Sequence, residues 1–531
     1  MKKIAVFLTL ILAFTTNAIS QEKWTPEKIM EYKNITGTNI SPDGKYVAYV
    51  VRTPVMADDK SEYNSQIWVA AVDGSFDIQY TRGEKSSSSP KFSPDSKKIA
   101  FTSNRNDNKN QIFVMRLMGG EPEQITKADK SVGSFEWSPD GENIAYLMSD
   151  PETEEEKKQK KGKTDVIIVD TNYKFNHIYT VPVEETEGER KSQRLTNGEF
   201  HVRDFDWSPD GSTIAFSHSP TPRINDLGLR ANISTVPSDS GAVNQLVNRP
   251  GTDYNPRYSP DGKSLVFQSS GGKPERVGLN DFYKYDIESG EYEALKQTPN
   301  RQSSFVSWVN DEQILLSEPY KTSSSIFALP TQKDLKIEPN AYPEVTETGL
   351  PLLTSSNGTI GGVSVSKSGN AISYVYEEPG MPEEIYVSDL KGGNVKKLTS
   401  QNAGFNPPKT AKTELVSWKS KDGMVIEGLL TYPVDFEDGK KYPIILQIHG
   451  GPGGVFTKGY TGAPSIYMTQ YFAENGYIIL RPNPRGSTGY GKEFRYANIM
   501  DWGYGDYQDL MTGVDHVIDM GIADKKNQFV M

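Results

Sequence analysis

Residues 41–50 read SPDGKYVAYV, and this pattern of a turn followed by alternating apolar residues returns along most of the chain. Close copies are SPDSKKIAF at 93–101, SPDGENIAY at 138–146, SPDGSTIAF at 208–216 and SPDGKSLVF at 259–267. Serine, proline and glycine in the first, second and fourth places suit a type I turn, because proline presets φ and the serine or aspartate side chain bonds the turn backbone. The residues that follow alternate as in a half-buried strand. Each copy therefore predicts a tight turn leading into a β-strand.

The spacing of the copies predicts a repeat architecture. With two weaker copies included, the starts fall at residues 41, 93, 138, 208, 259, 309 and 366. Short strands and turns with a period of roughly 50 residues are typical of β-propeller blades. We therefore expect an all-β seven-bladed propeller over residues 21–410. An open β-solenoid is the alternative, although its repeats are usually shorter.

The composition excludes several kinds of site. The 531 residues include no cysteine and five histidines, and the net charge is −11. Without cysteine there is no disulfide, thiolate nucleophile or iron–sulfur cluster, and no two histidines have the spacing of a helical metal pair. A negative chain is an improbable partner for nucleic acid. We therefore expect no metal, no cofactor and no nucleic-acid partner.

The N-terminus has the features of an export signal. Lys2 and Lys3 precede an apolar run at residues 4–14, and small residues end at Ser20, just before Gln21. This pattern predicts a signal peptide over residues 1–20, cleaved between Ser20 and Gln21, and a periplasmic or secreted protein. A membrane anchor is the alternative, but the run is shorter than the ~20 apolar residues that span a bilayer. We expect no stable membrane anchor.

A different pattern begins near residue 411, after a linker. Apolar strand candidates at 424–432, 444–448, 477–480 and 528–531 alternate with helix candidates at 464–475 and 506–520. Strands that are apolar throughout are typical of a parallel sheet buried on both faces. The alternation predicts an α/β domain over residues 411–531, with a parallel sheet and flanking helices.

Three motifs in this region carry a resemblance. HGGPGG at 449–454 ends one strand candidate, RGSTGYG at 485–491 follows the next, and DWG at 501–503 precedes the last helix candidate. Placed after such a propeller, these motifs resemble the prolyl oligopeptidase family of serine peptidases, in particular its acylaminoacyl and bacterial dipeptidyl peptidases. The resemblance implies an α/β-hydrolase fold, short peptide substrates and a serine that forms an acyl-enzyme.

The nucleophile of an α/β-hydrolase lies in a Gly-x-Ser-x-Gly turn, and Asp and His follow it in the chain. No such pentapeptide occurs in the 531 residues, and the last strand candidate is the one that would lead into it. We therefore expect an incomplete α/β-hydrolase domain. The catalytic serine, aspartate and histidine are expected after residue 531, and this chain alone should not hydrolyse peptides.

The resemblance carries over one part of the site, the oxyanion hole. One donor of this hole comes from an HGGG-like loop, in which glycine lets the backbone turn its N–H toward the developing O⁻. We expect Gly451 to be that donor, with Gly450 as the second choice. Arg485 and Asp501 are expected to brace the site by an ion pair, with a place in the lining of the site as the alternative. His449 is expected to have a structural role.

Some features have a second interpretation. GSTGYGK at 486–492 matches a phosphate-binding loop, but Glu493 stands where serine or threonine would hold Mg²⁺. Glu184 and Glu185 are interpreted as solvated charges rather than as a site for a peptide amino terminus, and the charged insertion at 151–163 as a solvated loop. The whole protein could instead be a non-catalytic binding propeller of the cell envelope or an esterase. Residue preference, exo- or endo-cleavage and oligomeric state stay open.

Overall fold

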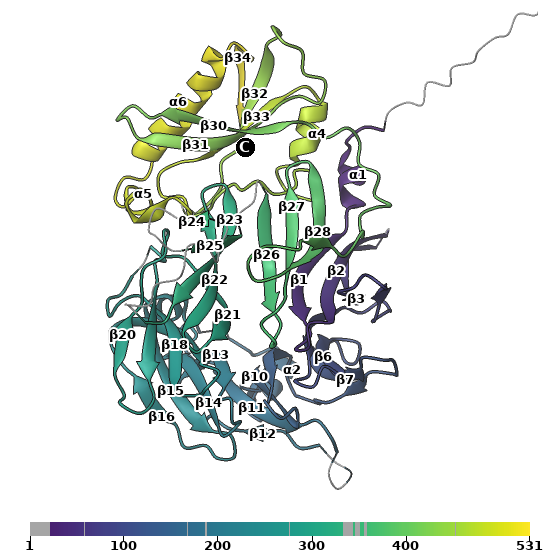
Figure 1. The fold of residues 1–531 in the computed structure, drawn as a ribbon, viewed down its shortest axis with the longest axis vertical. Helices are drawn as coiled ribbons and strands as arrows, with labels where there is room; N and C mark the ends of the chain where they lie inside the picture. The colour runs from purple at the N-terminus through teal and green to yellow at the C-terminus, as the bar shows by residue number, and fades with distance from the viewer. Residues whose placement is uncertain are drawn as a thin grey trace, which may run out of the picture.

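The computed structural model describes residues 22–531 with the exception of 58, 167, 186–187, 189, 276, 333–343, 346–350, 355–357 and 452. The predicted signal peptide and its cleavage site at Ser20 and Gln21 lie outside the described residues. Within those residues no helix combines the length and the apolar character that crossing a membrane requires. Figure 1 shows two parts, a large set of β-sheets and a smaller α/β part at one end of it.

The sheets of the larger part follow one another along the chain. The first three contain four antiparallel strands each, and each is built from one contiguous segment. Their strands are β1 (Asn34–Ile40), β2 (Tyr46–Ala57), β3 (Lys60–Ala71), β4 (Asp77–Gln79), β5 (Ser87–Phe92), β6 (Lys98–Ser103), β7 (Gln111–Arg116), β8 (Glu123–Gln124), β9 (Val132–Trp137), β10 (Asn143–Ser149), β11 (Asn176–Pro182) and β12 (Gln193–Arg194).

The next strands form an eight-stranded, a five-stranded and a four-stranded sheet. A short parallel bridge that pairs Arg230 with Gly251 and Ala231 with Thr252 joins β15 to β17 in the eight-stranded sheet. The strands are β13 (His201–Trp207), β14 (Thr213–Ser219), β15 (Arg230–Pro237), β16 (Asn244–Val247), β17 (Gly251–Tyr258), β18 (Ser264–Ser269), β19 (Asp281–Asp286), β20 (Tyr292–Ala294), β21 (Ser304–Asn310), β22 (Gln313–Tyr320), β23 (Ser323–Pro330), β24 (Glu344–Val345), β25 (Pro351–Thr354), β26 (Thr359–Val365), β27 (Ile372–Glu378), β28 (Met381–Ser388) and β29 (Lys396–Lys397).

Each Ser-Pro-Asp-Gly turn leads into a strand, as the sequence predicts, and connects it to the antiparallel strand before it. In the turn between β13 and β14, Ser208 Oγ donates to Asp210 Oδ1 at 2.6 Å and accepts the Thr213 N–H at 3.0 Å. The Gly211 N–H donates to the Ser208 carbonyl at 2.9 Å, the bond that closes a β-turn. Gly211 has a φ of +74°, which favours glycine. The turn therefore satisfies its polar groups from its own residues.

The first and last sheets of the larger part meet. β1 packs against β26 and β27. Glu383 on β28 accepts the Ile35 N–H at 2.5 Å and the Asn34 side-chain amide at 3.3 Å, and both partners lie on β1. Thr38 Oγ1 donates to the Gly362 carbonyl at 2.6 Å across the same seam. In the described residues β1–β4 and β26–β29 belong to separate sheets. These side-chain contacts and a bond from the Ser368 N–H to the Pro42 carbonyl at 3.2 Å close the ring.

The smaller part is a five-stranded sheet in the order β30-β31-β33-β32-β34. Its strands are β30 (Thr413–Lys419), β31 (Val425–Thr431), β32 (Tyr442–Leu446), β33 (Ile478–Asn483) and β34 (Ala523–Val530). β33, β32 and β34 are parallel, whereas β30 and β31 run antiparallel to their neighbours. The prediction of a parallel sheet is therefore wrong for these two strands. A tight turn at Asp422 and Gly423 joins them, and so short a connection has to reverse the chain.

Three helices accompany this sheet: α4 (Thr469–Glu474), α5 (Gly491–Tyr496) and α6 (Gly505–Asp519). α6 packs Val514 and Val517 against Ile478 and Leu480 of β33, as its apolar stripe predicts. α4 begins later than the predicted start at residue 464. Met468 precedes it with a φ of +41°, and this left-handed conformation interrupts a right-handed helix.

In the described residues the larger part has three short helices, α1 (Pro26–Met30), α2 (Glu154–Lys161) and α3 (Ile224–Leu229). α2 lies in the charged insertion, so the prediction of a loop there is wrong. Thr153 and Glu156 form a capping box, and the glutamates of the first turn and lysines of the last turn complement the helix dipole. None of the eight residues of α2 is buried, so the insertion is solvated, as predicted.

Backbone and aromatic contacts join the two parts. The Lys321 N–H donates to the Gly489 carbonyl at 2.8 Å, and the Lys458 N–H donates to the Thr322 carbonyl at 2.7 Å. An aromatic cluster near α1 joins the N-terminal segment, the linker and the α/β part, and its largest members are Trp24, Tyr32, Phe405 and Tyr460. The α/β part is therefore seated on the ring along one end (Figure 1).

Candidate functional site

The candidate site is the loop that follows β32, from His449 to Gly454. β32 is buried between β33 and β34, and the loop leaves the sheet at the carboxyl end of these parallel strands. Gly451 has a φ of +137°, and a Cβ at this position would lie 2.7 Å from the Gly454 nitrogen. Position 451 therefore requires glycine, both for its conformation and for space.

The two glycines proposed for the oxyanion hole differ in their surroundings. An added Cβ at Gly450 would meet nothing within 4 Å, so the loop does not require glycine there. Among the described residues, neither the Gly450 N–H nor the Gly451 N–H donates a hydrogen bond. Unpaired backbone donors at a tight turn are what a developing oxyanion needs. The geometry thus distinguishes Gly451 as the constrained donor, while Pro452 lies outside the described residues.

The segment after β33 supports this loop. Thr488 Oγ1 donates to the Gly453 carbonyl at 2.7 Å, and the Thr488 N–H donates to the Gly454 carbonyl at 3.2 Å. His449 Nε2 lies 3.1 Å from Ser487 Oγ. Burial lowers the pKa of His449, so this imidazole is neutral at pH 7. These contacts hold the HGGPGG segment against RGSTGYG, and they agree with a structural role for His449.

Arg485 makes its short ion pairs with residues other than the predicted Asp501. The backbone N–H and the Nε of Arg485 both donate to Asp509 Oδ2, at 2.8 and 2.9 Å. The Arg485 Nη2 donates to Asp509 Oδ1 at 2.8 Å. Asp422 lies 2.8 Å from the guanidinium, whereas Asp501 lies at 4.0 Å. The hydrogen bonds to Asp509 raise the pKa of Arg485. Arg485 is a buried brace between β33 and α6.

The main contact of Asp501 is with the start of α6, and not the predicted ion pair with Arg485. Its Oδ2 accepts the N–H of Gly505, the first residue of α6, at 3.1 Å. A carboxylate at this position stabilises the N-terminal end of a helix. Arg485 and Asp501 are thus brought close together, but Asp501 mainly caps α6.

A pocket of about 510 Å³ opens beside the glycine loop, between the two parts of the molecule. It is lined by Gly451 and Gly453, by a segment that begins in α5, and by a propeller loop; these residues are Arg495, Tyr496, Asn498, Ile499, Met500, Trp502, Pro274, Glu275 and Val277. Arg495 donates to the Val277 carbonyl at 2.9 Å, and Tyr496 donates its hydroxyl to Glu275. Both parts of the chain therefore shape the space next to Gly451.

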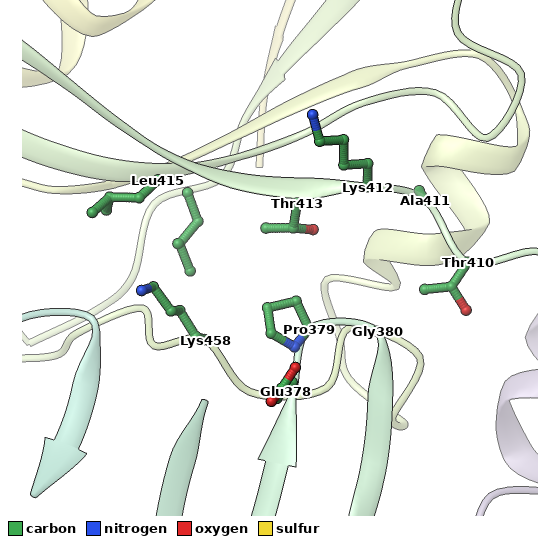
Figure 2. Close-up of a pocket in the computed structure, with 10 residues that line it drawn as sticks. Glu378, Pro379, Gly380, Thr410, Ala411, Lys412, Thr413, Leu415 and Lys458 are labelled. Atoms are coloured by element: carbon green, nitrogen blue, oxygen red, sulfur yellow. The ribbon is translucent and has the colours of Figure 1, made fainter. Parts of the chain in front are cut away.

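A second pocket, of about 560 Å³, lies elsewhere on the interface. Figure 2 shows it between the residues that lead into β30 and the turn that joins β27 to β28. Its charged lining residues are Glu378, Lys412 and Lys458, and no residue of the glycine loop belongs to it. We therefore place the candidate site in the first pocket, where the unpaired N–H groups are.

The paired glutamates Glu184 and Glu185 make ion pairs with neighbouring residues of the propeller. Glu184 pairs with Lys98 at 2.6 Å and Glu185 with Arg190 at 3.5 Å, so both belong to surface ion pairs. Among the described residues, no three histidines or carboxylates gather in a way that could hold a metal ion.

Sequence reasoning missed several residues of the pocket. Arg495 and Asn498 lie just before the DWG motif, and only that proximity could have drawn attention to them. Glu275 belongs to a propeller loop, and its place opposite α5 depends on how the two parts dock. The sequence contains no signal for such a contact.

A ring of antiparallel sheets that carries an α/β sheet with a glycine loop at a strand end has the architecture of a propeller-bearing hydrolase. Comparison with known proteins agrees. Residues 25–174 match the TolB beta propeller domain, and residues 465–531 match the prolyl oligopeptidase family. The first match confirms the predicted propeller, and the second confirms the predicted resemblance to the prolyl oligopeptidase family.

Individual relatives agree with this assignment. The chain is 28% identical to dipeptidyl-peptidase 5 of Porphyromonas gingivalis, over 93% of this chain and 73% of the relative. It is also 28% identical to probable dipeptidyl-peptidase 5 of Emericella nidulans, over 60% of this chain, and spans 43% of that relative. Acylaminoacyl peptidase of Pyrococcus horikoshii has a similar fold, with a TM-score of 0.73, 20% identity and coverage of 96% of this chain and 75% of that chain. The relatives are thus named peptidases, the class that the sequence predicts.

Proposed function

We propose that the chain is the propeller and the first part of the catalytic domain of an exported serine peptidase that hydrolyses short peptides. One observation carries this proposal. Gly451 is held in a conformation that requires glycine, its N–H is unpaired among the described residues, and it lines a pocket between the propeller and the α/β sheet. The names of the relatives support peptides as substrates.

In the proposed reaction the Gly451 N–H stabilises the oxyanion that forms when the serine attacks the scissile carbonyl. A donor of this kind contributes about 3 kcal/mol of transition-state stabilisation. The serine, aspartate and histidine belong, in this proposal, to residues after 531, and the 531 residues alone are inactive. Arg485 and Asp509 act only by positioning the segment that supports the glycine loop.

The finer architecture is part of the proposal. We count seven blades over residues 21–410 by dividing the eight-stranded sheet at its two-residue parallel bridge. Residues 411–531 then form the incomplete α/β-hydrolase domain. The ring would restrict access to the pocket, so short or unfolded peptides are the expected substrates. The alternatives are a non-catalytic envelope propeller and an esterase of the same fold.

The test compares the product of the complete reading frame with the chain of 531 residues. A serine-directed fluorophosphonate should label the complete product, and a panel of short peptides and acyl esters should show peptide hydrolysis. The 531-residue chain should show neither. Hydrolysis of esters without peptides would favour the esterase, and absence of labelling in the complete product would favour the non-catalytic propeller.

Export has its own test. N-terminal sequencing of the mature protein from the cell envelope or medium should begin at Gln21. A mature protein that retains Lys2 and Lys3, or that stays in the cytoplasmic fraction, contradicts this part of the proposal.

A further inference from the structure

Asn498 is a buried side chain in the wall of the pocket that contains Gly451. Only 2% of the residue is exposed. Neither Oδ1 nor Nδ2 has a hydrogen-bond partner among the described residues. The residue lines the same pocket as Gly451 and Gly453. An uncommitted amide therefore lies beside the unpaired N–H groups of the glycine loop.

The position of this amide is fixed by its surroundings. A Cβ on Gly486 would lie 2.9 Å from Asn498 Nδ2, so the amide lies directly against the Gly486 backbone. Gly486 has a φ of +93°, which again favours glycine. The chain thus keeps a backbone without a side chain next to Asn498, and the Asn498 side chain packs against that backbone in the wall of the pocket.

A buried amide without partners is costly. An unsatisfied buried donor or acceptor destabilises the folded state, and native proteins keep few of them. The neighbouring polar groups are committed, in contrast. Glu275 accepts the Val277 N–H at 2.7 Å and the Tyr496 hydroxyl, and Arg495 donates to the carbonyls of Val277 and Gly486. Asn498 is therefore the group in this wall that is left for a bound molecule.

The chemistry of the amide selects the kind of molecule. A carboxamide offers two N–H donors and a carbonyl with two lone pairs. In an extended peptide the N–H and the C=O of one residue point to the same side of the chain, so a single Asn side chain can pair with both. A carboxylate or an ammonium group would use only one half of the amide.

We propose that Asn498 binds the main chain of the substrate peptide. Its Oδ1 accepts an N–H and its Nδ2 donates to a C=O of the peptide, while the Gly451 N–H faces the scissile carbonyl. This inference rests on the proposed function and deepens it, because it names a contact that recognises a peptide by its backbone. Asn498 acts here as a substrate-positioning residue.

The test measures binding to the 531-residue chain, so it does not depend on catalysis. The probes are acetyl-Ala-Ala-Phe-amide and analogues in which one peptide N–H at a time is replaced by an ester oxygen. Titration calorimetry gives Kd, and fluorescence of Trp502, which lines the pocket, gives an independent readout. The variants are Asn498→Leu, which keeps the shape of the side chain, and Asn475→Ala, which changes an exposed asparagine outside the pocket.

The expected result is a coupling between the residue and one peptide bond. Asn498→Leu should weaken binding of the all-amide peptide about fivefold to tenfold, the usual value of one or two neutral hydrogen bonds. One ester analogue should bind the native chain correspondingly less tightly but bind Asn498→Leu no worse than the amide does. Asn475→Ala should bind like the native chain. The melting temperature of Asn498→Leu should be unchanged or higher, because no bond within the protein is lost.

Two results would overturn the inference and leave the proposed function standing. One is tight peptide binding by Asn498→Leu with no coupling to any ester position. The other is a large fall in its melting temperature, which would show that the amide is bonded within the protein. If the native chain binds none of the peptides, both the inference and the proposed function fail.

Discussion

The turn at Ser208 and the loop at Gly451 use glycine and hydrogen bonds in opposite ways. In the propeller turn, the Gly211 N–H is paired with the Ser208 carbonyl, and Ser208 Oγ pairs with both Asp210 and the Thr213 N–H. In the loop after β32, the N–H groups of Gly450 and Gly451 are unpaired in the described part of the chain. Its support comes from residues beyond its own segment, such as Thr488.

This difference separates a structural element from a candidate site. A turn that satisfies itself can be repeated along a chain without regard to its neighbours. A loop with unpaired donors is stable only where distant segments hold it, and those donors are then available to a ligand. Substitutions in the support of the loop, in the loop itself and in the propeller should therefore have different effects on stability.

The largest effect is expected from the brace behind the loop. Arg485→Ala removes the partner of Asp509, a carboxylate with 0% exposure. Leaving such a charge unpaired typically costs about 3–5 kcal/mol, and we expect a loss of that size in the free energy of unfolding. Urea unfolding followed by circular dichroism measures it. Lys157→Ala, in the exposed pair with Glu154 on α2, should change nothing measurable. A loss of under about 1 kcal/mol for Arg485→Ala would show that the brace is not needed.

A smaller effect is expected at the glycine itself. Gly451→Ala places a Cβ against the Gly454 backbone at a φ of +137°, and strain of this kind costs about 1–3 kcal/mol. Gly450→Ala is the matched control, because its Cβ would meet nothing within 4 Å. The two variants are compared by thermal unfolding. Equal melting temperatures would mean that the loop relaxes freely and that position 451 is not constrained.

The smallest effect concerns pH and lies in the propeller. His177 is fully buried, and burial lowers its pKa to about 4, below the ordinary value of 6.5. The unfolded chain therefore binds a proton at a higher pH than the folded chain does. The contribution of His177 to stability is complete above about pH 6.5 and is lost as the pH falls toward 4, with about 2 kcal/mol lost by pH 5. Unfolding at pH 7 and pH 5 measures this, and His177→Gln should reduce the difference. An unchanged difference would contradict it.

Much of the fold could be predicted because its signals are local. The Ser-Pro-Asp-Gly turns carry their own hydrogen bonds, so a few residues of sequence suffice to recognise them. The apolar stripe of α6 predicts its buried face for the same reason. The antiparallel start of the α/β sheet was not predicted, because an apolar strand has the same pattern in either direction. The helix in the insertion is not predicted because the run of charged residues was interpreted as a loop. The capping box of Thr153 and Glu156 indicates the start of a helix there.

The candidate site was only partly predictable. Gly451 follows from the motif at the end of a strand, but Arg485 was paired with Asp501, the nearer residue in sequence, instead of Asp509. The sequence does not indicate that the Arg485 side chain lies against α6, which contains Asp509. Asn498 and Glu275 meet at one pocket only because the propeller docks onto the α/β part. Such contacts depend on the tertiary fold as a whole.

The seam of the ring has a consequence for the order of folding. Glu383 and Ile35 are separated by 348 positions in the chain, whereas each four-stranded sheet is built from one contiguous segment. Bringing distant segments together carries a larger entropic cost than forming a hairpin, and it slows folding. The individual sheets should therefore form early, and the meeting of β1 with β26 should be the slow step. Until that step, we expect the newly made chain to be an open arc in which the apolar faces of its first and last sheets are uncovered.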